Sequence, residues 1–206
     1  MYYRPMDGSS PDVTAFILAG GKSTRMGADK AFVIFDGGTL LARALEVVRS
    51  VTSDVRIVGD ASTFASFASV VEDIFRECGP LGGIHAALRA SRTELNVILA
   101  VDLPFVSPAL IEYLIKRARE CAAATVTVAQ ADGGRQPLCA VYRREFADAA
   151  EQALLAGHYR IDALFEAGNA KVIGEEELEA AGFSSRMFRN LNTRAELEAV
   201  REVGGS

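Results

Sequence analysis

The sequence predicts a single α/β domain built around a largely parallel sheet. Apolar runs typical of buried strands alternate with amphipathic helical segments along most of the 206 residues. No internal repeat or low-complexity linker interrupts this alternation, and a chain of this length suits one domain with a substantial core. Ligands of such sheets bind at the carboxyl ends of the strands, so we expect functional residues in the loops that follow strands.

The first half of the chain predicts a tail, four strands and two helices. Residues 1–12, MYYRPMDGSSPD, lack the apolar stretch of a signal peptide and are predicted to form a disordered tail, which leaves 13–206 for the domain. The first helix places Leu41 and Leu45 on one face and charged side chains on the other. The helices cover 39–50 and 82–91, and the strands cover the apolar runs at 13–19, 55–59, 69–72 and 96–101.

The second half predicts two further strands among three helices. Ser107 followed by Pro108 is an N-cap with proline at the first helical position, and it starts a helix through ALIEYLIKRARE. A later helix ends at Gly157, a typical C-terminal cap, and Thr193 with Glu196 forms the capping box of a last helix. The other segments are strands at 125–130 and 138–143, a helix at 144–157 and a strand or loop at 187–192.

Composition excludes several classes of function. The net charge of −5, from 22 basic and 27 acidic residues, argues against general binding to nucleic acid or to a membrane surface. The apolar runs are too short to span a bilayer. Three scattered cysteines without a C-x-x-C pair indicate a reduced, cytosolic chain without a disulfide framework or zinc ribbon. Two histidines without an H-E-x-x-H pattern argue against a histidine-based metal site.

A glycine-rich, basic loop follows the first strand. Residues 18–30, LAGGKSTRMGADK, place backbone N–H groups and cationic side chains where they can meet an anion. The loop is not a Walker motif, because the position five residues before Gly21 is Phe16, and no register supplies G-x-G-x-x-G. The sequence therefore predicts a phosphate-binding loop of another kind.

Two more segments follow strands. Asp102 ends the apolar run VILAV and precedes Leu-Pro, so it is either a turn residue or a ligand for Mg²⁺, which takes one or two carboxylates plus substrate phosphates. Because a predicted phosphate-binding loop is also present, the metal-ligand role is favoured over the turn role for Asp102. CGPLGGI, residues 78–84, either forms only a strand-to-helix turn or exposes backbone groups to a flat ligand such as a base, and its composition favours the turn.

Four motifs in order carry a resemblance to a known family. L-A-G-G-x-S-x-R-M-G-x-D-K, G-P-L-G-G, D-L-P-F and a late N-x-N-T make the chain similar to the molybdenum cofactor guanylyltransferase (MobA) family, from about residue 13 to 200. The resemblance implies a Rossmann-like, three-layer fold of the nucleotide-diphosphosugar-transferase kind, with a mostly parallel, mixed sheet. It also implies Mg²⁺-dependent transfer of GMP from GTP to the terminal phosphate of molybdopterin, with release of pyrophosphate. The implied partners are GTP, molybdopterin and other proteins of molybdenum cofactor biosynthesis, in the cytoplasm.

The resemblance assigns roles to individual residues through these motifs. Arg25, Lys30 and Asp102 are the implied catalytic residues, with Asp102 as the magnesium ligand. The triphosphate and base edge are assigned to Leu18, Ala19, Gly20, Gly21, Arg25 and Lys30. The nucleotide and its base pocket are assigned to Asp73, Gly79, Pro80, Leu81, Gly82 and Gly83. The acceptor half is assigned to Arg135, Gln136, Pro137, Asn190 and Asn192.

The chain departs from the family pattern at two places. Gly59-Asp60 stands where the family often carries asparagine, which leaves the ribose contacts unassigned. Arg194 replaces the proline of the usual N-T-P, and because proline at a first helical position is a stability device, its loss need not affect function. Asn192 and Thr193 have an alternative role as caps of the last helix.

Two alternative functions remain. One is a related transferase that uses CTP or a sugar-phosphate acceptor, but the cytidylyl relatives read L-A-A-G where Gly20 gives L-A-G-G, which favours guanine. The other is a non-catalytic GTP-binding protein, in which Lys30 and Asp102 would be free to vary, whereas both are present. The implied chemistry needs no general base because the attacking phosphate is already ionised near neutral pH. Charge stabilisation by Arg25, Lys30 and a bound Mg²⁺ is what the reaction requires.

Overall fold

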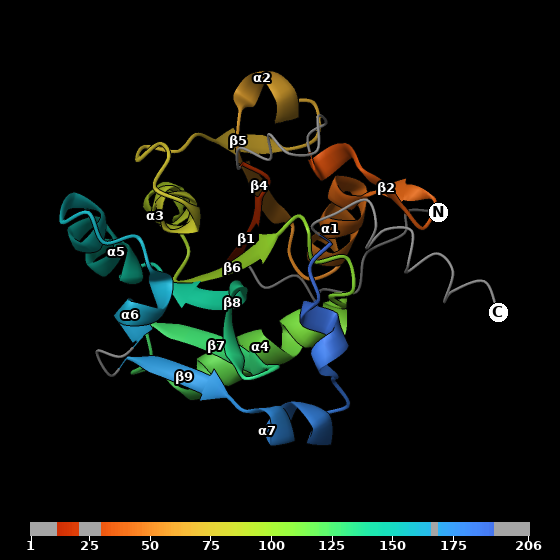
Figure 1. The fold of residues 1–206 in the computed structure, drawn as a ribbon, viewed down its shortest axis with the longest axis vertical. Helices are drawn as coiled ribbons and strands as arrows, with labels where there is room; N and C mark the ends of the chain where they lie inside the picture. Colours follow the sequence, from red (N-terminus) through yellow and green to blue (C-terminus); the bar gives the residue numbers. More distant parts are fainter. Residues whose placement is uncertain (1–11, 21–29, 166–168, 192–206) are drawn as a thin grey trace.

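The computed structural model describes residues 12–20, 30–165 and 169–191, and these form a seven-stranded sheet with helices on both faces (Figure 1). The strand order is β5-β4-β1-β6-β8-β7-β9. Neighbours are parallel except at β8, which is antiparallel to both β6 and β7. The sheet strands are β1 Val13–Leu18, β4 Asp54–Val58, β5 Ser69–Val71, β6 Leu95–Ala100, β7 Val126–Ala131, β8 Gly134–Arg143 and β9 Ala170–Ile173. This mostly parallel, mixed sheet confirms the predicted fold class.

Helices cover the two faces of the sheet in pairs. Helices α1 and α4 pack together on one face, and α3 and α5 pack together on the other (Figure 1). A small hairpin of β2 Ile34–Phe35 and β3 Gly38–Thr39 and two 3₁₀ turns, η1 Lys30–Phe32 and η2 Ser185–Phe188, complete the elements. The helices are α1 Leu40–Arg49, α2 Ala61–Phe64, α3 Pro80–Ala90, α4 Pro108–Glu120, α5 Phe146–Leu155, α6 Ile161–Phe165 and α7 Glu175–Ala180. No helix among the residues described is long and apolar enough to cross a membrane.

The central strand β1 is buried on both faces because side chains alternate along a strand. Ala15 and Ile17 belong to the core shared with α1 and α4, whereas Phe16 and Leu18 belong to the core shared with α3 and α5. A strand between two such cores reads as a continuous apolar run, which is why VTAFIL was predicted correctly.

The predicted helix ends are largely confirmed. Thr39 accepts a hydrogen bond from the backbone N–H of Ala42 and caps α1, and Ser107 accepts one from Leu110 ahead of Pro108 in α4. Gly157 has a φ of +75° just after α5, as expected of a C-terminal glycine.

Several expectations are corrected. Helix α3 starts at Pro80, two residues before the predicted start, because proline at its first position follows Gly79 with a φ of +68°. Strand β8 starts at Gly134 because it forms a hairpin with β7, and the turn places Asp132 and Gly133 at positive φ. In the segment predicted as strand or loop, Met187 and Phe188 belong to a 3₁₀ turn, η2, and residues 189–191 form a loop. Strand β9 and the β2–β3 hairpin were not predicted. Residues 1–11 of the predicted tail and the predicted last helix lie outside the described residues, so the proposed domain limits stay a prediction.

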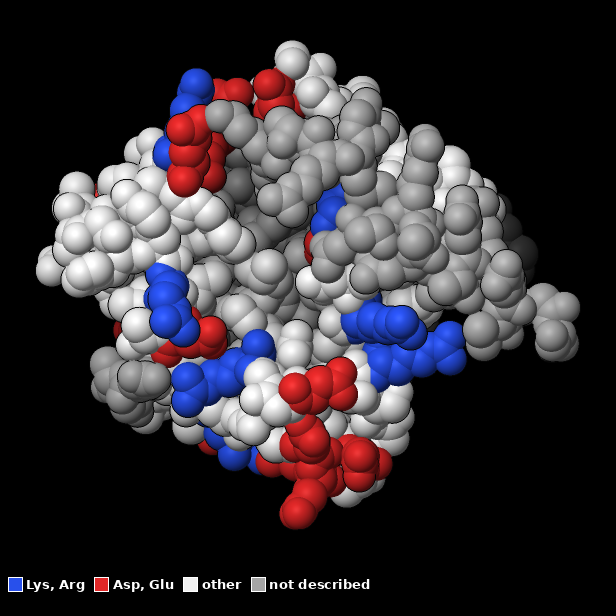
Figure 2. Space-filling model, in the orientation of Figure 1, with Lys and Arg blue, Asp and Glu red and all other residues white. Residues whose placement is uncertain are grey.

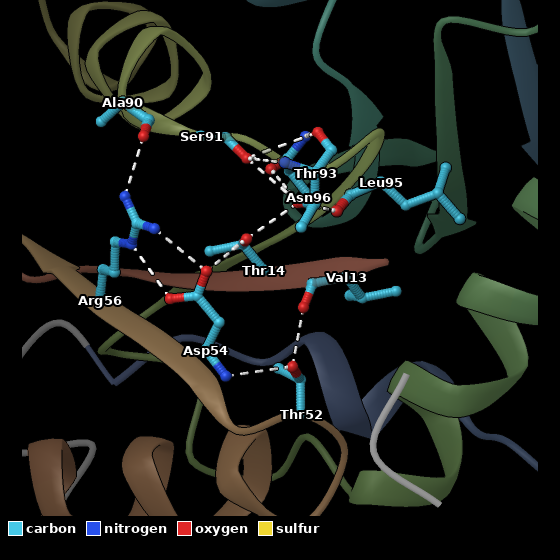
Figure 3. Close-up of polar contacts among 10 residues, drawn as sticks. All are labelled: Val13, Thr14, Thr52, Asp54, Arg56, Ala90, Ser91, Thr93, Leu95 and Asn96. Carbon is cyan, nitrogen blue, oxygen red and sulfur yellow. Dashed lines mark hydrogen bonds and ion pairs between the residues drawn. The ribbon is translucent and has the colours of Figure 1, made fainter. Parts of the chain in front are cut away.

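A polar network joins the strands at their amino ends (Figure 3). Thr14 on β1 donates to Asp54 Oδ2 at 2.9 Å and lies 2.8 Å from the Thr93 hydroxyl in the loop before β6. Arg56 donates to both oxygens of Asp54 and to the carbonyl of Ala90. Burial opposes the ionisation of Asp54, but the hydrogen bonds from Arg56 and Thr14 outweigh it and hold the pKa of Asp54 below its usual value.

Asp54→Asn is expected to lower the free energy of unfolding by about 1 kcal/mol at neutral pH. The expected change in the free energy of unfolding is small because the Asp54 side chain is 42% exposed. A depressed carboxyl pKa stabilises the fold above the unfolded-state pKa, and this contribution is lost as the pH falls through the folded-state pKa. The difference between wild type and variant should therefore shrink below about pH 4 in urea unfolding. Glu112→Gln, an exposed amide replacement on α4, is the matched control, and an unchanged difference at low pH would contradict the assignment.

Candidate active site

The glycine-rich loop leaves the sheet between the carboxyl ends of two neighbouring strands. The backbone N–H groups of Ala19 and Gly20 both donate to the carbonyl of Val58 at the end of β4, at 3.0 and 3.1 Å. On the other side, the N–H of Val101 donates to the carbonyl of Leu18 at 3.1 Å. The face shown in Figure 2 is hollowed near its centre, where these strands end in Figure 1. The predicted phosphate loop therefore starts at the edge where parallel sheets bind ligands.

Two of the predicted catalytic residues meet at this edge. The ammonium of Lys30, on η1, donates to Asp102 Oδ2 at 2.7 Å, although the two residues are 72 positions apart. The side chains are 20% and 17% exposed, so solvent screens their pairing only in part. The second carboxylate oxygen, Asp102 Oδ1, receives no hydrogen bond from a described residue. The pair thus presents a cation and one unengaged carboxylate oxygen at the end of β6.

This arrangement fits a magnesium ion that is shared with a substrate. Within the described ranges, no group of three or more histidine, cysteine, aspartate or glutamate side chains could hold a metal by itself. Mg²⁺ commonly binds one or two carboxylates and completes its shell with water and phosphate oxygens. Asp102 Oδ1 fits the role of that single protein ligand, provided that the substrate supplies the phosphates.

Asp73 lies against the first turn of α3, in the loop that follows β5. A Cβ atom at Gly82 would lie 3.0 and 3.3 Å from the Asp73 oxygens and 2.7 Å from the carbonyl of Phe75, so glycine allows this close approach. Asp73 Oδ1 is buried and has no hydrogen-bond partner among the described residues. Burial raises the pKa of Asp73, against a smaller lowering by the backbone N–H of Phe75. A buried acceptor without a donor is a site for a ligand N–H or O–H group.

The predicted base-pocket segment is the start of a helix rather than a loop. Gly79 and Pro80 are exposed, but Leu81 is fully buried in the core beneath α3, and Gly82 and Gly83 are buried within the first turn. Only the first two residues of the segment therefore reach the surface, and the glycines serve close packing against Asp73 and against Leu18.

Three of the residues predicted for the acceptor, Arg135, Gln136 and Pro137, lie at the start of β8. Because β8 is antiparallel to β6, its amino end lies at the edge where β6 ends. The guanidinium of Arg135 lies over the ring of Phe165, 5.8 Å from its centroid. Gln136 donates to the carbonyls of Ala131 and Gly134, and Pro137 accepts from the hydroxyl of Tyr142. Gln136 and Pro137 are thus engaged in the hairpin itself.

The segment 189–191 comes back to the end of β6. The backbone N–H of Leu191 donates to the carbonyl of Asp102 at 3.0 Å, and the exposed Asn190 is the residue before Leu191. The sequence motif could not reveal this bond, since it joins main-chain atoms of distant residues. Three predicted site residues, Gly21, Arg25 and Asn192, lie outside the described residues. Of the others, the described contacts join Lys30 with Asp102, but they join neither Asp73 nor Arg135 to that pair.

A cavity of about 530 Å³ lies at the opposite edge of the sheet. Its charges pair with one another, for example Arg143 with Glu94 and Arg89 with Asp148. The lining residues are Arg89, Arg92, Thr93, Glu94, Ala122, Arg143, Arg144, Glu145 and Asp148. Because this edge carries the amino ends of β1 and β6, it is not the edge where ligands of parallel sheets bind.

Comparison with known proteins agrees with this geometry. Residues 15–172 match the family described as "MobA-like NTP transferase domain". A molybdenum cofactor guanylyltransferase of Desulfosudis oleivorans is 37% identical over 191 residues, which cover 90% of this chain and 93% of the relative. Another from Syntrophotalea carbinolica is 31% identical over 193 residues, covering 93% and 91%.

Solved structures share the fold. The molybdopterin-guanine dinucleotide biosynthesis protein A of Archaeoglobus fulgidus superposes with a TM-score of 0.80 at 30% identity, covering 93% of this chain and 98% of that one. A CMP:2-keto-3-deoxy-manno-octonic acid synthetase, at 13% identity and a TM-score of 0.65 over 94% of this chain and 98% of that one, shows the fold alone. The family match covers most of the chain, and the chain belongs to the MobA-like NTP transferase family.

Proposed function

We propose that this protein is a molybdenum cofactor guanylyltransferase. It transfers GMP from GTP to the terminal phosphate of molybdopterin, releases pyrophosphate and forms molybdopterin guanine dinucleotide. The observation that carries the proposal is the Lys30–Asp102 pair, which lies at the end of β6 beside the start of the glycine-rich loop. The guanylyltransferase relatives, which cover about nine-tenths of the chain, support it.

The mechanism follows from charge. The acceptor phosphate must approach the α-phosphorus of GTP, and both are anionic, so the site must reduce their repulsion. Lys30 is held in place by Asp102 before substrate arrives, so its ammonium need not reorganise to stabilise negative charge on the phosphoryl oxygens. Mg²⁺ bound by Asp102 and the substrate phosphates would add further neutralisation. No proton needs to be removed from an ionised phosphate, so the reaction requires no general base.

Nucleotide recognition is assigned to the first turn of α3. Asp73 Oδ1 lacks a donor in the buried space beside Gly82, and an N–H or O–H group of the bound nucleotide would supply it. The exposed Gly79 and Pro80 lie at the start of the same turn. The sequence L-A-G-G, in which Gly20 replaces the second alanine of the cytidylyl relatives, supports recognition of guanine rather than cytosine.

Gly82→Ala is expected to weaken GTP binding by about tenfold or more, because the new Cβ would displace Asp73 or the carbonyl of Phe75. The matched control is Gly83→Ala in the same helical turn, where a Cβ would meet only Leu18 and Val58 at 3.5 and 3.6 Å, an ordinary contact. Both variants gain the same helix propensity, so they differ mainly in the contact with Asp73. Equal GTP dissociation constants for the two variants, measured by calorimetry, would contradict the role of Asp73.

One assay tests the function itself. Pyrophosphate release should be measured from each nucleoside triphosphate, with and without Mg²⁺ and with and without molybdopterin. We expect release only when GTP, Mg²⁺ and molybdopterin are present together, because both substrates must be held in line. Equal rates with CTP, or with glucose 1-phosphate as acceptor, would identify a different transferase. GTP binding without any turnover would favour a non-catalytic binding protein.

Two further assignments belong to this proposal. Other proteins of molybdenum cofactor biosynthesis are the expected suppliers of molybdopterin. A cytoplasmic location is expected from the cysteines, and all three, Cys78, Cys121 and Cys139, are free thiols in the structure.

A further inference from the structure

An arginine outside the family motifs lies beside the proposed site. Arg186, on η2, places its guanidinium over the ring of Phe105, 5.4 Å from the centroid. Phe105 belongs to the turn that follows Asp102 and packs edge-to-face against Phe35, with 5.5 Å between the ring centroids. We propose that Arg186 binds the terminal phosphate of the acceptor and so sets the affinity for an anionic acceptor. This inference rests on the proposed function.

The ring positions the guanidinium without using its hydrogen-bond donors. A cation over an aromatic face is attracted by the ring quadrupole, and the planar guanidinium then keeps its N–H edge available for a bidentate contact with phosphate. Among the described residues, no carboxylate or carbonyl accepts a hydrogen bond from Arg186. Its charge is therefore not neutralised by a neighbour within the described part of the chain.

A second arginine on the same aromatic pair gives the contrast. Arg43 lies over Phe35, 5.6 Å from the centroid, but it donates to the carbonyl of Pro104 and lies 3.6 Å from an oxygen of Asp36. Arg43 is thus engaged by the protein and ties the turn after Asp102 to α1. Arg186 also lies over an aromatic ring, but it lacks those partners. Arg43 therefore stabilises the fold, whereas Arg186 can bind a ligand.

The path of the chain into η2 indicates that Arg186 would bind the phosphate of the acceptor rather than the phosphates of GTP. The chain reaches η2 from α7, which packs on β7, and Phe183 between them packs on Tyr113 of α4. It then continues to Leu191, whose N–H bonds to the carbonyl of Asp102. The glycine-rich loop, proposed for the triphosphate, arrives instead from β1. Figure 2 shows basic side chains beside η2 at the rim of the hollow and others across it.

In-line transfer requires the attacking phosphate and the leaving pyrophosphate on opposite sides of the α-phosphorus. A cation held over Phe105, in the turn after Asp102, on a segment that arrives from β7, would meet the attacking group. The new P–O bond forms between an acceptor phosphate oxygen and the α-phosphorus of GTP, and the bond from the α-phosphorus to the α–β bridging oxygen breaks, so that this oxygen leaves in pyrophosphate. Arg186 takes no part in these bonds, but it reduces the charge repulsion that the acceptor meets as it binds.

The test is acceptor kinetics on Arg186→Gln and Arg186→Lys, with exposed Arg92→Gln at the opposite edge as the matched control. Arg186→Gln should raise KM for molybdopterin about tenfold or more, as expected from the loss of charge-assisted hydrogen bonds, and leave KM for GTP within about twofold. Arg186→Lys should recover only part of the loss, because an ammonium cannot reproduce the fork. Arg92→Gln should match wild type.

A binding readout separates this inference from the proposed function. Quenching of pterin fluorescence measures molybdopterin affinity without turnover, and it should weaken in Arg186→Gln by the same factor as KM rises. Wild-type turnover with an unchanged acceptor KM in Arg186→Gln would overturn the inference and leave the proposed function intact. A rise in KM for GTP instead would also overturn it, because Arg186 would then act on the nucleotide. Wild type that binds no molybdopterin would overturn both.

Discussion

Asp102→Ala is expected to lower kcat by about 100-fold or more while the protein stays folded. The substitution removes the carboxylate that we propose as the Mg²⁺ ligand, and it breaks the ion pair between Lys30 and Asp102. The fold should survive, because the bond from Leu191 to Asp102 uses the backbone carbonyl and the side chain is not part of the core. Steady-state kinetics over a range of Mg²⁺ concentrations measure the effect.

Asp102→Asn is the control for side-chain size. It keeps the shape and a neutral oxygen but loses the charge, so it should require far more Mg²⁺ for half-maximal activity and should not recover the wild-type kcat. Unfolding curves must show that both variants are folded. Near-normal turnover of folded Asp102→Ala would mean that Asp102 is a turn residue and that the metal is held elsewhere.

Lys30→Ala is expected to lower kcat/KM for GTP by roughly 2–4 kcal/mol of transition-state stabilisation. The ammonium is only 20% exposed and pairs with Asp102, so it would meet the phosphates with little reorganisation and with partial exclusion of water. The loss should appear in kcat as well as in GTP affinity, because charge develops on the phosphoryl oxygens during the reaction.

The comparison for Lys30 is a second lysine from the same motif. Lys22 occupies a variable position in L-A-G-G-x-S-x-R, and we expect Lys22→Ala to cost less than about 1 kcal/mol. The double variant Lys30→Ala/Asp102→Ala should lose less than the sum of the single variants, because each single change already breaks the pair. A loss of kcat/KM for GTP in Lys22→Ala as large as that in Lys30→Ala would indicate that the triphosphate binds to another part of the loop.

The fold was predicted best where strands are buried on both faces. The runs VTAFIL and LNVILA are apolar except for Thr14 and Asn96 because two helical layers cover them, and such runs stand out in a sequence. Strand β9 was missed because its four residues, AKVI, are mostly half-buried and show no clear alternation. The β2–β3 hairpin has strands of two residues, too short for any period to appear.

The candidate site was predicted residue by residue, but its contacts were not. Motifs named Lys30 and Asp102, yet only the sheet order, which places β1 beside β6, brings them within 2.7 Å. The composition of CGPLGGI favoured a turn, and the structure gives a helix start in which Gly82 admits Asp73. Arg186 escaped notice because its position depends on an aromatic ring 81 residues earlier in the chain.

The reversed direction of β8 has a consequence for how proteins of this fold can diverge. A parallel strand contributes its last residues to the functional edge, whereas β8 contributes its first, Gly134–Leu138, which are exposed or half-buried. The part of β8 that must pack, Cys139–Arg143, lies farther along and is fully covered. If the first residues of β8 contact the acceptor as proposed, mutations there would change acceptor selectivity with little effect on the packing of β6, which ends at Ala100, two residues before Asp102. Under that proposal, one sheet would retain its nucleotide chemistry over evolutionary time while the preferred acceptor changes.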